Sequence, residues 1–355
     1  MKRVGNLYAR TLTPEALRHA FHMAARHKHS KRGCFNFEKH LASNLDALYQ
    51  ELSDGSYSPR QYYTFVVHEP KRRTIYAPAF RDLVVQHAIY RVISPIFERI
   101  FIDQSFACRI GKGTHKAADY AQAALQASPP GSYTLKLDIR KFFYRINRVI
   151  LRELIERKIK DARMVDLMMA FADHGEPVGI PIGNLLSQLY ALIYLNPLDH
   201  FIKRELGIKR YCRYVDDFVL FGITRDYAVE CQARIIAFIK DELSLELSKS
   251  TIAPISRGIN FVGYRTWVSK RFIRRHSLYN YRVALRNGKT DSAISILGHA
   301  QRTHSLQHML RLSKEKHYAD HHLLQKIYRP ASNADIAPSG RRGSSPDRYR
   351  AGHPA

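Results

Sequence analysis

The chain has 355 residues, of which 45% are hydrophobic, and a formal net charge of +26 at pH 7. This length supports a sizeable core and roughly two or three subdomains. Positive charge in this excess favours a polyanionic partner, most often nucleic acid, and no apolar run is long enough to span a bilayer. The basic N-terminus lacks the apolar core of a signal peptide, and the four cysteines contain no CxxC pair, so we expect a cytoplasmic protein without membrane contact, disulfide framework or structural zinc site.

The N-terminal third is predicted to be helical, with one β-hairpin. A helix starts at residues 13–15, where a threonine cap precedes proline, and a second helix runs from about Phe35 to the Gly/Pro/Ser turn of residues 52–59. Two strands follow, the first over residues 62–67, and the basic turn of residues 71–73 leads into the second. An apolar helix comes after the hairpin.

The central third alternates short strands with helices. The strand within SYTLKLDIRKFF, residues 132–143, alternates apolar and polar side chains and precedes helices over residues 147–158 and 163–171. A further apolar helix starts at Asn184 and is predicted to be interrupted by Pro197. The sequence YCRYVDDFVLFG then fits two short strands joined by a tight turn.

The C-terminal third becomes more basic along its length. An amphipathic helix over residues 227–243 and a strand over residues 245–253 are predicted to complete a sheet. Residues 265–328 are helix-leaning and basic, and residues 329–355, rich in Ser, Gly, Pro, Arg and Ala, are typical of a disordered tail. No ribonuclease H or endonuclease motif is present.

Three carboxylates are the strongest chemical signal. Asp138 ends a half-buried strand on its polar face, and Asp216 and Asp217 fall in the tight turn between two strands. Adjacent carboxylates repel each other, so a hard divalent cation, Mg²⁺ by default with Mn²⁺ as an alternative, is the natural counter-charge. Together the three form the ligand set for phosphoryl transfer by two ions ~3.5–4 Å apart. We expect Asp138 and Asp216 to bind most directly and Asp217 less strictly; the simpler interpretation is a solvated turn.

These motifs resemble a known family. YVDD on a hairpin, preceded by LKLDIRKFF and IPIGNLLSQ, is similar to the palm of reverse transcriptases, and most similar to those of diversity-generating retroelements and group II introns. The resemblance covers residues 48–264. It implies an α+β right-hand polymerase with fingers, an antiparallel-sheet palm and a helical thumb. The implied domains are an N-terminal helical extension (1–47), fingers (48–131), a palm with finger elements (132–264), a basic thumb (265–328) and a disordered basic tail (329–355).

The resemblance also implies a nucleotide site. Arg73, assisted by Lys71, would contact the triphosphate, and the backbone N–H groups of Lys141 and Phe142 would hold its phosphates. Phe143 would pack under the sugar and exclude a 2′-hydroxyl, which disfavours an RNA-synthesising polymerase. The remaining nucleotide-binding candidates are Ile182, Gly183, Gln188 and Lys249.

Ile182 is the most discriminating of these residues. Many reverse transcriptases carry a hydrogen-bonding glutamine there, whereas the retroelement enzymes carry an aliphatic residue. Because hydrogen-bonding sites reject wrong ligands better than apolar sites do, Ile182 predicts low copying fidelity.

Nucleic-acid contacts are implied outside the nucleotide site. The segment QSFACRIGKGTHKA matches a template-facing motif of the family, and the segment GINFVGY matches the primer grip. Basic thumb residues would follow the duplex through its backbone. The candidates are Arg109, Lys112, Lys116, Gly263, Tyr264, Arg274 and Arg275.

The expected function is therefore RNA-directed DNA synthesis. The resemblance implies error-prone copying of a structured template RNA into cDNA from dNTPs, in a bacterial or phage-encoded diversity-generating retroelement, with a small basic accessory protein as partner. The alternative is an antiphage-defence reverse transcriptase that copies its own non-coding RNA beside a defence effector. A different class of function, a non-catalytic RNA-binding protein on an inactive palm, is disfavoured by the three intact aspartates.

Overall fold

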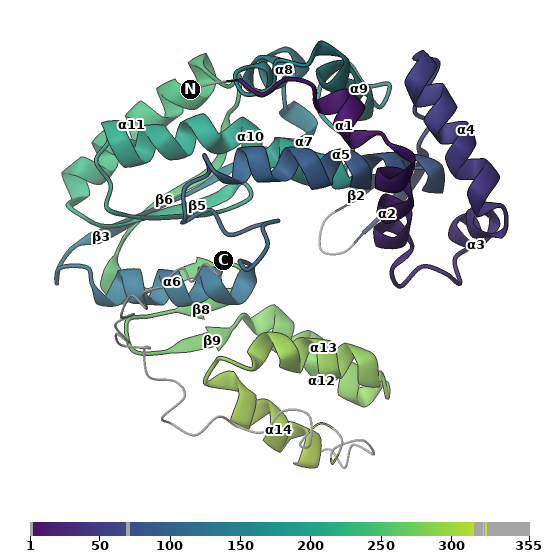
Figure 1. The fold of residues 1–355 in the computed structure, drawn as a ribbon. Coiled ribbons are helices and arrows are strands. Elements are labelled where there is room, and N and C mark those ends of the chain that lie inside the picture. The colour runs from purple at the N-terminus through teal and green to yellow at the C-terminus, as the bar shows by residue number, and fades with distance from the viewer. Residues whose placement is uncertain (1–2, 69–71, 316–321, 323, 325–355) are drawn as a thin grey trace, which may run out of the picture. The chain divides into compact units, whose positions relative to one another are not determined.

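The computed structural model describes residues 3–68, 72–315, 322 and 324. The chain divides into two compact units: Met1–Val262 with Thr266–Val268, and Gly263–Arg265 with the residues from Ser269 onward. None of the helices in the described part is long and apolar enough to cross a membrane. The mixed helices and antiparallel sheets confirm the predicted α+β class (Figure 1).

The first unit begins with helices. They are α1 (Leu7–Thr11), α2 (Pro14–Ala25), α3 (Arg32–Lys39) and α4 (Leu41–Asp54). Thr13 caps α2 as predicted, because its side chain accepts a hydrogen bond from the Ala16 N–H. The single helix expected from Phe35 is instead two, separated at His40, whose φ and ψ of −125° and 45° are not helical.

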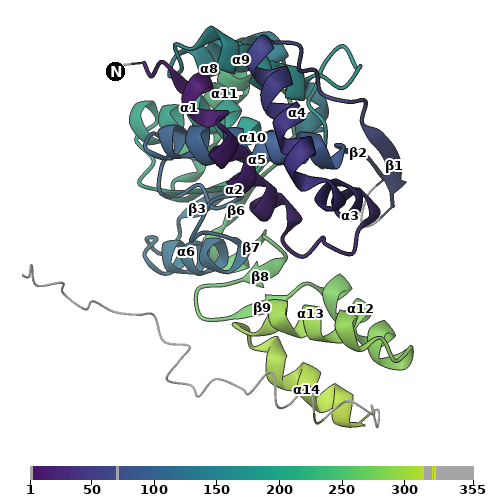
Figure 2. The same cartoon turned by 45° about the vertical axis from the view of Figure 1, so that its right-hand side comes forward.

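A two-stranded hairpin and a long helix follow. The antiparallel strands β1 (Tyr63–Val67) and β2 (Arg73–Ala77) project as a separate ribbon in Figure 2. Every residue of β1 is exposed. Helix α5 (Phe80–Glu98) is buried along much of its length, and α6 (Thr114–Gln126) comes next in the chain.

The palm is a four-stranded sheet with the order β4-β5-β3-β6, formed by β3 (Tyr133–Ile139), β4 (Arg210–Tyr214), β5 (Asp217–Ile223) and β6 (Leu247–Pro254). All of its pairings are antiparallel. Leu135 and Leu137 enter the main hydrophobic core. Val219 and Phe221, on the other face, join a smaller cluster that includes alanines of α6. Asp138 and Asp217 share this second face, because side chains alternate along a strand.

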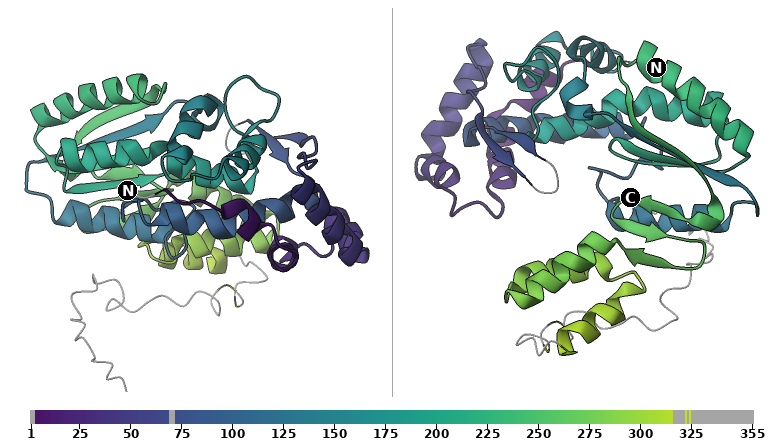
Figure 3. Two further views of the ribbon diagram at one scale, coloured as in Figure 1. Left: turned by 45° about the horizontal axis from the view of Figure 1, so that its top comes forward. Right: turned by 180° about the vertical axis from the view of Figure 1, so that it is seen from behind.

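Helices cover both faces of the sheet. Helices α10 (Leu185–His200) and α11 (Arg225–Asp241) lie on the face of Leu135, and α6 packs against β4 and β5 on the other (Figure 3). Short helices α7 (Phe142–Arg145), α8 (Arg148–Glu156) and α9 (Ala162–Ala172) connect β3 to α10.

Pro197 does not interrupt the helix that carries it, contrary to the expectation from the sequence. Helix α10 continues through Pro197 to His200 and passes into a π-helical turn, η1 (Phe201–Glu205). Proline removes one backbone donor, but the helix is buried on nearly all sides, so packing outweighs this local loss.

The remaining elements end the first unit and form the second. A 3₁₀ turn, η2 (Ile255–Arg257), precedes β7 (Ile259–Phe261) in the first unit. Strand β8 (Tyr264–Thr266) has its first two residues in the second unit and its last residue in the first. The second unit contains β9 (Arg271–Ile273) and the helices α12 (Arg275–Arg286), α13 (Thr290–Ala300) and α14 (Ser305–Glu315). Residues 329–355, predicted to be a disordered tail, lie outside the described residues.

Candidate active site

The three aspartates meet at one end of the palm sheet. Asp138 on β3 is directly opposite Asp217 on β5, and Lys249 on β6 is directly opposite Asp138 on its other side. Tyr214 on β4 continues this row next to Asp217. Opposite residues of antiparallel strands project from the same face, so the register alone places Asp217, Asp138 and Lys249 side by side.

The turn between β4 and β5 is tighter than the sequence predicted. Its two residues are Val215 and Asp216, and Asp217 is already the first residue of β5. Val215 has φ of 56°, a left-handed conformation that is rare for a β-branched residue. The Ile139 N–H donates to the Asp216 carbonyl at 3.2 Å. Strain of this kind persists where surrounding contacts enforce it, and it concentrates at functional sites.

Asp216 is in the most unfavourable environment for a negative charge. Its burial, together with the nearby charges of Asp138 and Asp217, raises its pKa to about 6, and Arg73 only partly opposes this shift. Among the described residues, no cation forms an ion pair with Asp138 or Asp216. A cluster of carboxylate oxygens with this excess of negative charge fits a hard divalent cation.

The other two carboxylates have protein partners. The Lys136 ammonium forms an ion pair with Asp217 and lies 5.8 Å from the centre of the Phe261 ring. The Ser248 hydroxyl donates to Asp138 Oδ1 at 2.5 Å. Lys136 lies on the same polar face of β3 as Asp138, so this ion pair places a positive charge beside the carboxylate cluster. We did not anticipate Lys136, Ser248 or their roles from the sequence.

A buried ion pair supports the turn between β4 and β5. The carboxylate of Asp199, on α10, pairs with Arg213 at 2.5 Å, and both side chains are 0% exposed. The Tyr211 hydroxyl donates to the same carboxylate at 2.7 Å. Arg213 Nη1 donates to the Val215 carbonyl at 2.9 Å, at the residue with positive φ. The network thus connects the helix behind the sheet to the turn that carries Asp216.

Two of the predicted nucleotide residues, Arg73 and Lys141, lie near this end of the sheet. Arg73 is the first residue of β2, and its positive charge is close enough to Asp216 to lower the pKa of that carboxyl group. Lys141 has φ of 47° and precedes α7, so its backbone turns sharply just beyond Asp138. Of the two phenylalanines, Phe142 is buried in the core at 2% exposure, whereas Phe143 is only partly buried. Of the two side chains, only that of Phe143 is accessible at the surface.

The turn of Ile182 and Gly183 is attached to the hairpin that carries Arg73. The Tyr76 N–H donates to the Ile182 carbonyl at 2.7 Å. Gly183 has φ of +107°, and a Cβ there would lie 2.8 Å from Ile75 Cγ2, so a glycine is required. Gln188 is exposed on α10, and Lys249 is exposed on β6. Lys71 lies outside the described residues.

Two of the predicted template contacts have other partners. Arg109 is only 7% exposed; it pairs with Glu98 and donates to the carbonyls of Ile102 and Ser105, so it holds its own loop. Lys112 forms an ion pair with Asp103. Lys116, in the first turn of α6, is exposed. Arg109 therefore stabilises its own loop, and its predicted contact with a template phosphate stays a prediction.

The predicted primer and duplex residues belong to the second unit. The Tyr264 side chain is buried, donates to the His299 carbonyl at 2.7 Å and stacks on the His299 ring. A Cβ on Gly263 would lie 2.6 Å from His299 Nε2, so packing within the unit is enough to explain a glycine here, and its contact with a primer stays a prediction. Arg274 and Arg275 are exposed at the start of α12.

Comparison with known proteins shows which family this chain belongs to. The family described as "Reverse transcriptase (RNA-dependent DNA polymerase)" matches residues 68–266, more than half of the chain. Protein YkfC of Escherichia coli K12 is 26% identical over 289 residues, covering 67% of this chain and 74% of its own length. The group II intron-encoded protein LtrA of Lactococcus lactis is 31% identical over 170 residues, covering 44% of this chain but only 28% of LtrA.

The solved structures that are similar to this chain include one of telomerase from Candida albicans with a fragment of telomeric RNA. It matches with a TM-score of 0.47 and 13% identity, and the match covers 76% of this chain and 55% of the telomerase chain. The family match spans both sequence segments that supply the aspartates and the turn of Ile182. The chain belongs to the reverse transcriptase family and contains an RNA-directed DNA polymerase domain.

Proposed function

We propose that this reverse transcriptase copies a structured template RNA into cDNA with low fidelity, as part of a diversity-generating retroelement. The observation that carries the proposal is the turn of Ile182 and Gly183, which is attached to β2 and presents an apolar side chain. An apolar side chain offers no hydrogen bond to a nucleotide, so a mispaired nucleotide loses little there.

The reaction is attack of a primer 3′-hydroxyl on the α-phosphate of a deoxynucleotide. The new P–O bond forms as the bond to the β-phosphate breaks, and pyrophosphate leaves. Asp138, Asp216 and Asp217 would hold two Mg²⁺ ions, which when bound supply charge stabilisation for both oxygens of the displacement. Arg73 would stabilise negative charge on the pyrophosphate, and Phe143 would exclude ribonucleotides.

Primer extension tests the polymerase itself. The assay uses an RNA template, a DNA primer, dNTPs and Mg²⁺, beside the double variant Asp216→Ala, Asp217→Ala. We expect DNA synthesis that the double variant loses. If the variant keeps RNA binding and the natural chain makes no DNA from any primer, even with RNA encoded next to its gene, a non-catalytic RNA-binding function is favoured.

Product sequencing tests the low fidelity. We expect errors to concentrate at template adenines and to fall in Ile182→Gln, while Ile182→Val, which preserves an apolar side chain, leaves the error spectrum unchanged. Equal spectra for the natural chain and Ile182→Gln would remove the support for a diversity-generating role. Accurate copying of one adjacent non-coding RNA would favour the antiphage-defence alternative.

A further inference from the structure

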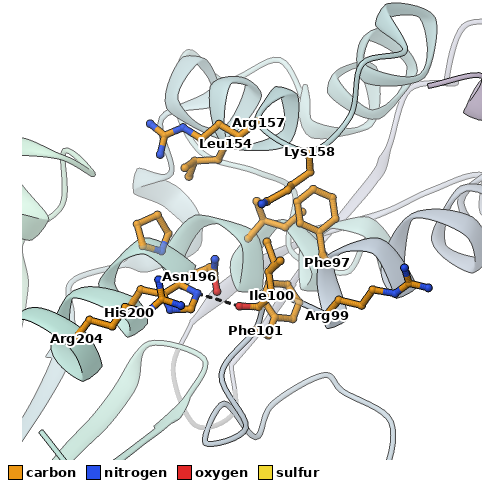
Figure 4. Close-up of a pocket in the computed structure, with 12 residues that line it drawn as sticks. Phe97, Arg99, Ile100, Phe101, Leu154, Arg157, Lys158, Asn196, His200 and Arg204 are labelled. Atoms are coloured by element: carbon orange, nitrogen blue, oxygen red, sulfur yellow. Dashed lines mark hydrogen bonds between the residues drawn. The ribbon is translucent and has the colours of Figure 1, made fainter. Parts of the chain in front are cut away.

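A second site candidate lies away from the catalytic aspartates. A cavity of ≈ 570 Å³ opens between the C-terminal ends of α5 and α8 and the end of α10 with η1 (Figure 4). Its volume is within the range of about 300–1,000 Å³ that is typical of small-molecule and cofactor sites. Its lining residues do not include Asp138, Asp216 or Asp217, and none of them carries a carboxylate.

The floor of the cavity is apolar and partly aromatic. It includes Phe97, Ile100, Phe101, Leu154 and Ile193. The rings of Phe97 and Phe101 are nearly parallel, with centroids 6.4 Å apart and planes 24° from each other. A floor of this kind suits a flat, weakly polar group such as a nucleobase.

The rim carries positive charge from three different elements. Arg99 follows α5, Arg157 follows α8, and Arg204 lies in η1, as Figure 4 shows. All three side chains are exposed, and none forms an ion pair with any residue in the described part of the chain. Exposed guanidinium groups around an opening without a carboxylate favour phosphate.

One polar atom in the cavity has no partner. Asn196 Oδ1 is buried, and it accepts no hydrogen bond from any residue that the structure describes. A buried acceptor without a donor is costly, and such atoms commonly mark a ligand or ordered-water position. Asn196 is also followed by Pro197 and, one turn later, by the π-helical η1, a type of irregularity frequent at functional sites.

We propose that this cavity binds an unpaired nucleotide, with the base on the apolar floor, an amino group of the base donating to Asn196 Oδ1, and the phosphates on Arg157 and Arg204. The nucleotide belongs either to a single-stranded segment of RNA or to a free nucleoside phosphate. A net charge of +26 favours RNA, because neighbouring phosphates can also be neutralised. The site would anchor RNA to the palm independently of catalysis.

Fluorescence anisotropy with a labelled single-stranded oligo(A) RNA tests the proposal. The full-length chain, without dNTPs, is titrated at several salt concentrations, and unlabelled ATP serves as a competitor. The test variant is Arg157→Gln, Arg204→Gln. The matched control is Arg18→Gln, Arg225→Gln, which removes the same charge from two exposed arginines outside the cavity.

We expect the test variant to weaken RNA binding roughly tenfold and to reduce the slope of log K against log salt by about 1.4, which corresponds to two phosphate contacts at about 0.7 each. The control should change both quantities much less. Asn196→Leu should weaken binding about three- to tenfold without changing the slope, because it removes one hydrogen bond and no phosphate contact.

The outcomes separate the two sources of the nucleotide. If ATP binding depends on Arg157 and Asn196 while RNA binding does not, the ligand is a free nucleotide. If the two double variants weaken RNA binding equally and ATP binding is unchanged in all variants, the proposal is overturned. Primer extension on saturating template should be unchanged in Arg157→Gln, Arg204→Gln, so that loss of this site is distinguished from loss of polymerase activity.

Discussion

Replacement of Asp199 by asparagine tests the support of the catalytic turn. The Asp199 carboxylate accepts hydrogen bonds from Arg213 Nε at 2.7 Å, Arg213 Nη2 at 2.5 Å and the Tyr211 hydroxyl at 2.7 Å. Asparagine has nearly the same shape, but it lacks the negative charge and presents N–H groups where donors already point. The substitution therefore leaves the Arg213 charge buried and unpaired.

The burial of Asp199 and Arg213 determines how much stability the substitution removes. Both side chains are 0% exposed, so solvent cannot replace the lost counter-charge. Removing one partner of a buried ion pair typically costs about 3–5 kcal/mol. At about 2–4 °C per kcal/mol for a domain of this size class, the melting temperature should fall by roughly 6–20 °C.

Thermal and urea unfolding measure this effect directly. The control is Asp46→Asn, which removes an exposed carboxylate from α4 and should change stability very little. If Asp199→Asn unfolds at the same urea concentration as the natural chain, the buried pair is not supporting the fold as inferred.

A catalytic effect should accompany the loss of stability. Arg213 donates to the Val215 carbonyl, so its displacement would move the turn that carries Asp216. A misplacement of about 1 Å can reduce the rate roughly 100-fold. Primer extension well below the lowered melting temperature should therefore show a reduced kcat with little change in KM for dNTP. An unchanged kcat would mean that the turn holds its position without Arg213.

Three further predictions concern the site. Asp216→Asn should reduce the rate of DNA synthesis about a thousandfold or more. In metal-free buffer it should preserve or raise the melting temperature, because it removes a buried negative charge that Asp138 and Asp217 repel. A large fall in the melting temperature would contradict this electrostatic explanation. Lys136→Met removes a positive charge beside the carboxylates, so it should lower the Mg²⁺ concentration needed for half-maximal synthesis about fivefold. It should also tighten Mn²⁺ binding measured by electron paramagnetic resonance. The control Lys136→Arg preserves the charge and should change neither quantity. Phe143→Ala should reduce the preference for dNTPs over NTPs about 10- to 100-fold in single-nucleotide incorporation, and an unchanged preference would place the sugar elsewhere.

The sequence alone was sufficient to identify the strands that carry the carboxylates and the family to which the chain belongs. Alternation along residues 133–139 and the paired aspartates between two apolar segments are encoded within a few consecutive residues. The same is true of the Thr13 cap, which depends on an atom three residues away. Local steric and hydrogen-bonding rules are enough to predict such features.

Only the tertiary structure decided which charges are paired. Lys136 and Asp217 are 81 residues apart, and the sequence around either residue does not indicate that they form an ion pair. The motif around Arg109 does not indicate that its guanidinium pairs with Glu98, and the segment around Tyr264 does not indicate that its ring stacks on His299. The pairing of side chains depends on the register of strands and the packing of helices, and these arise from the whole core and not from any local segment.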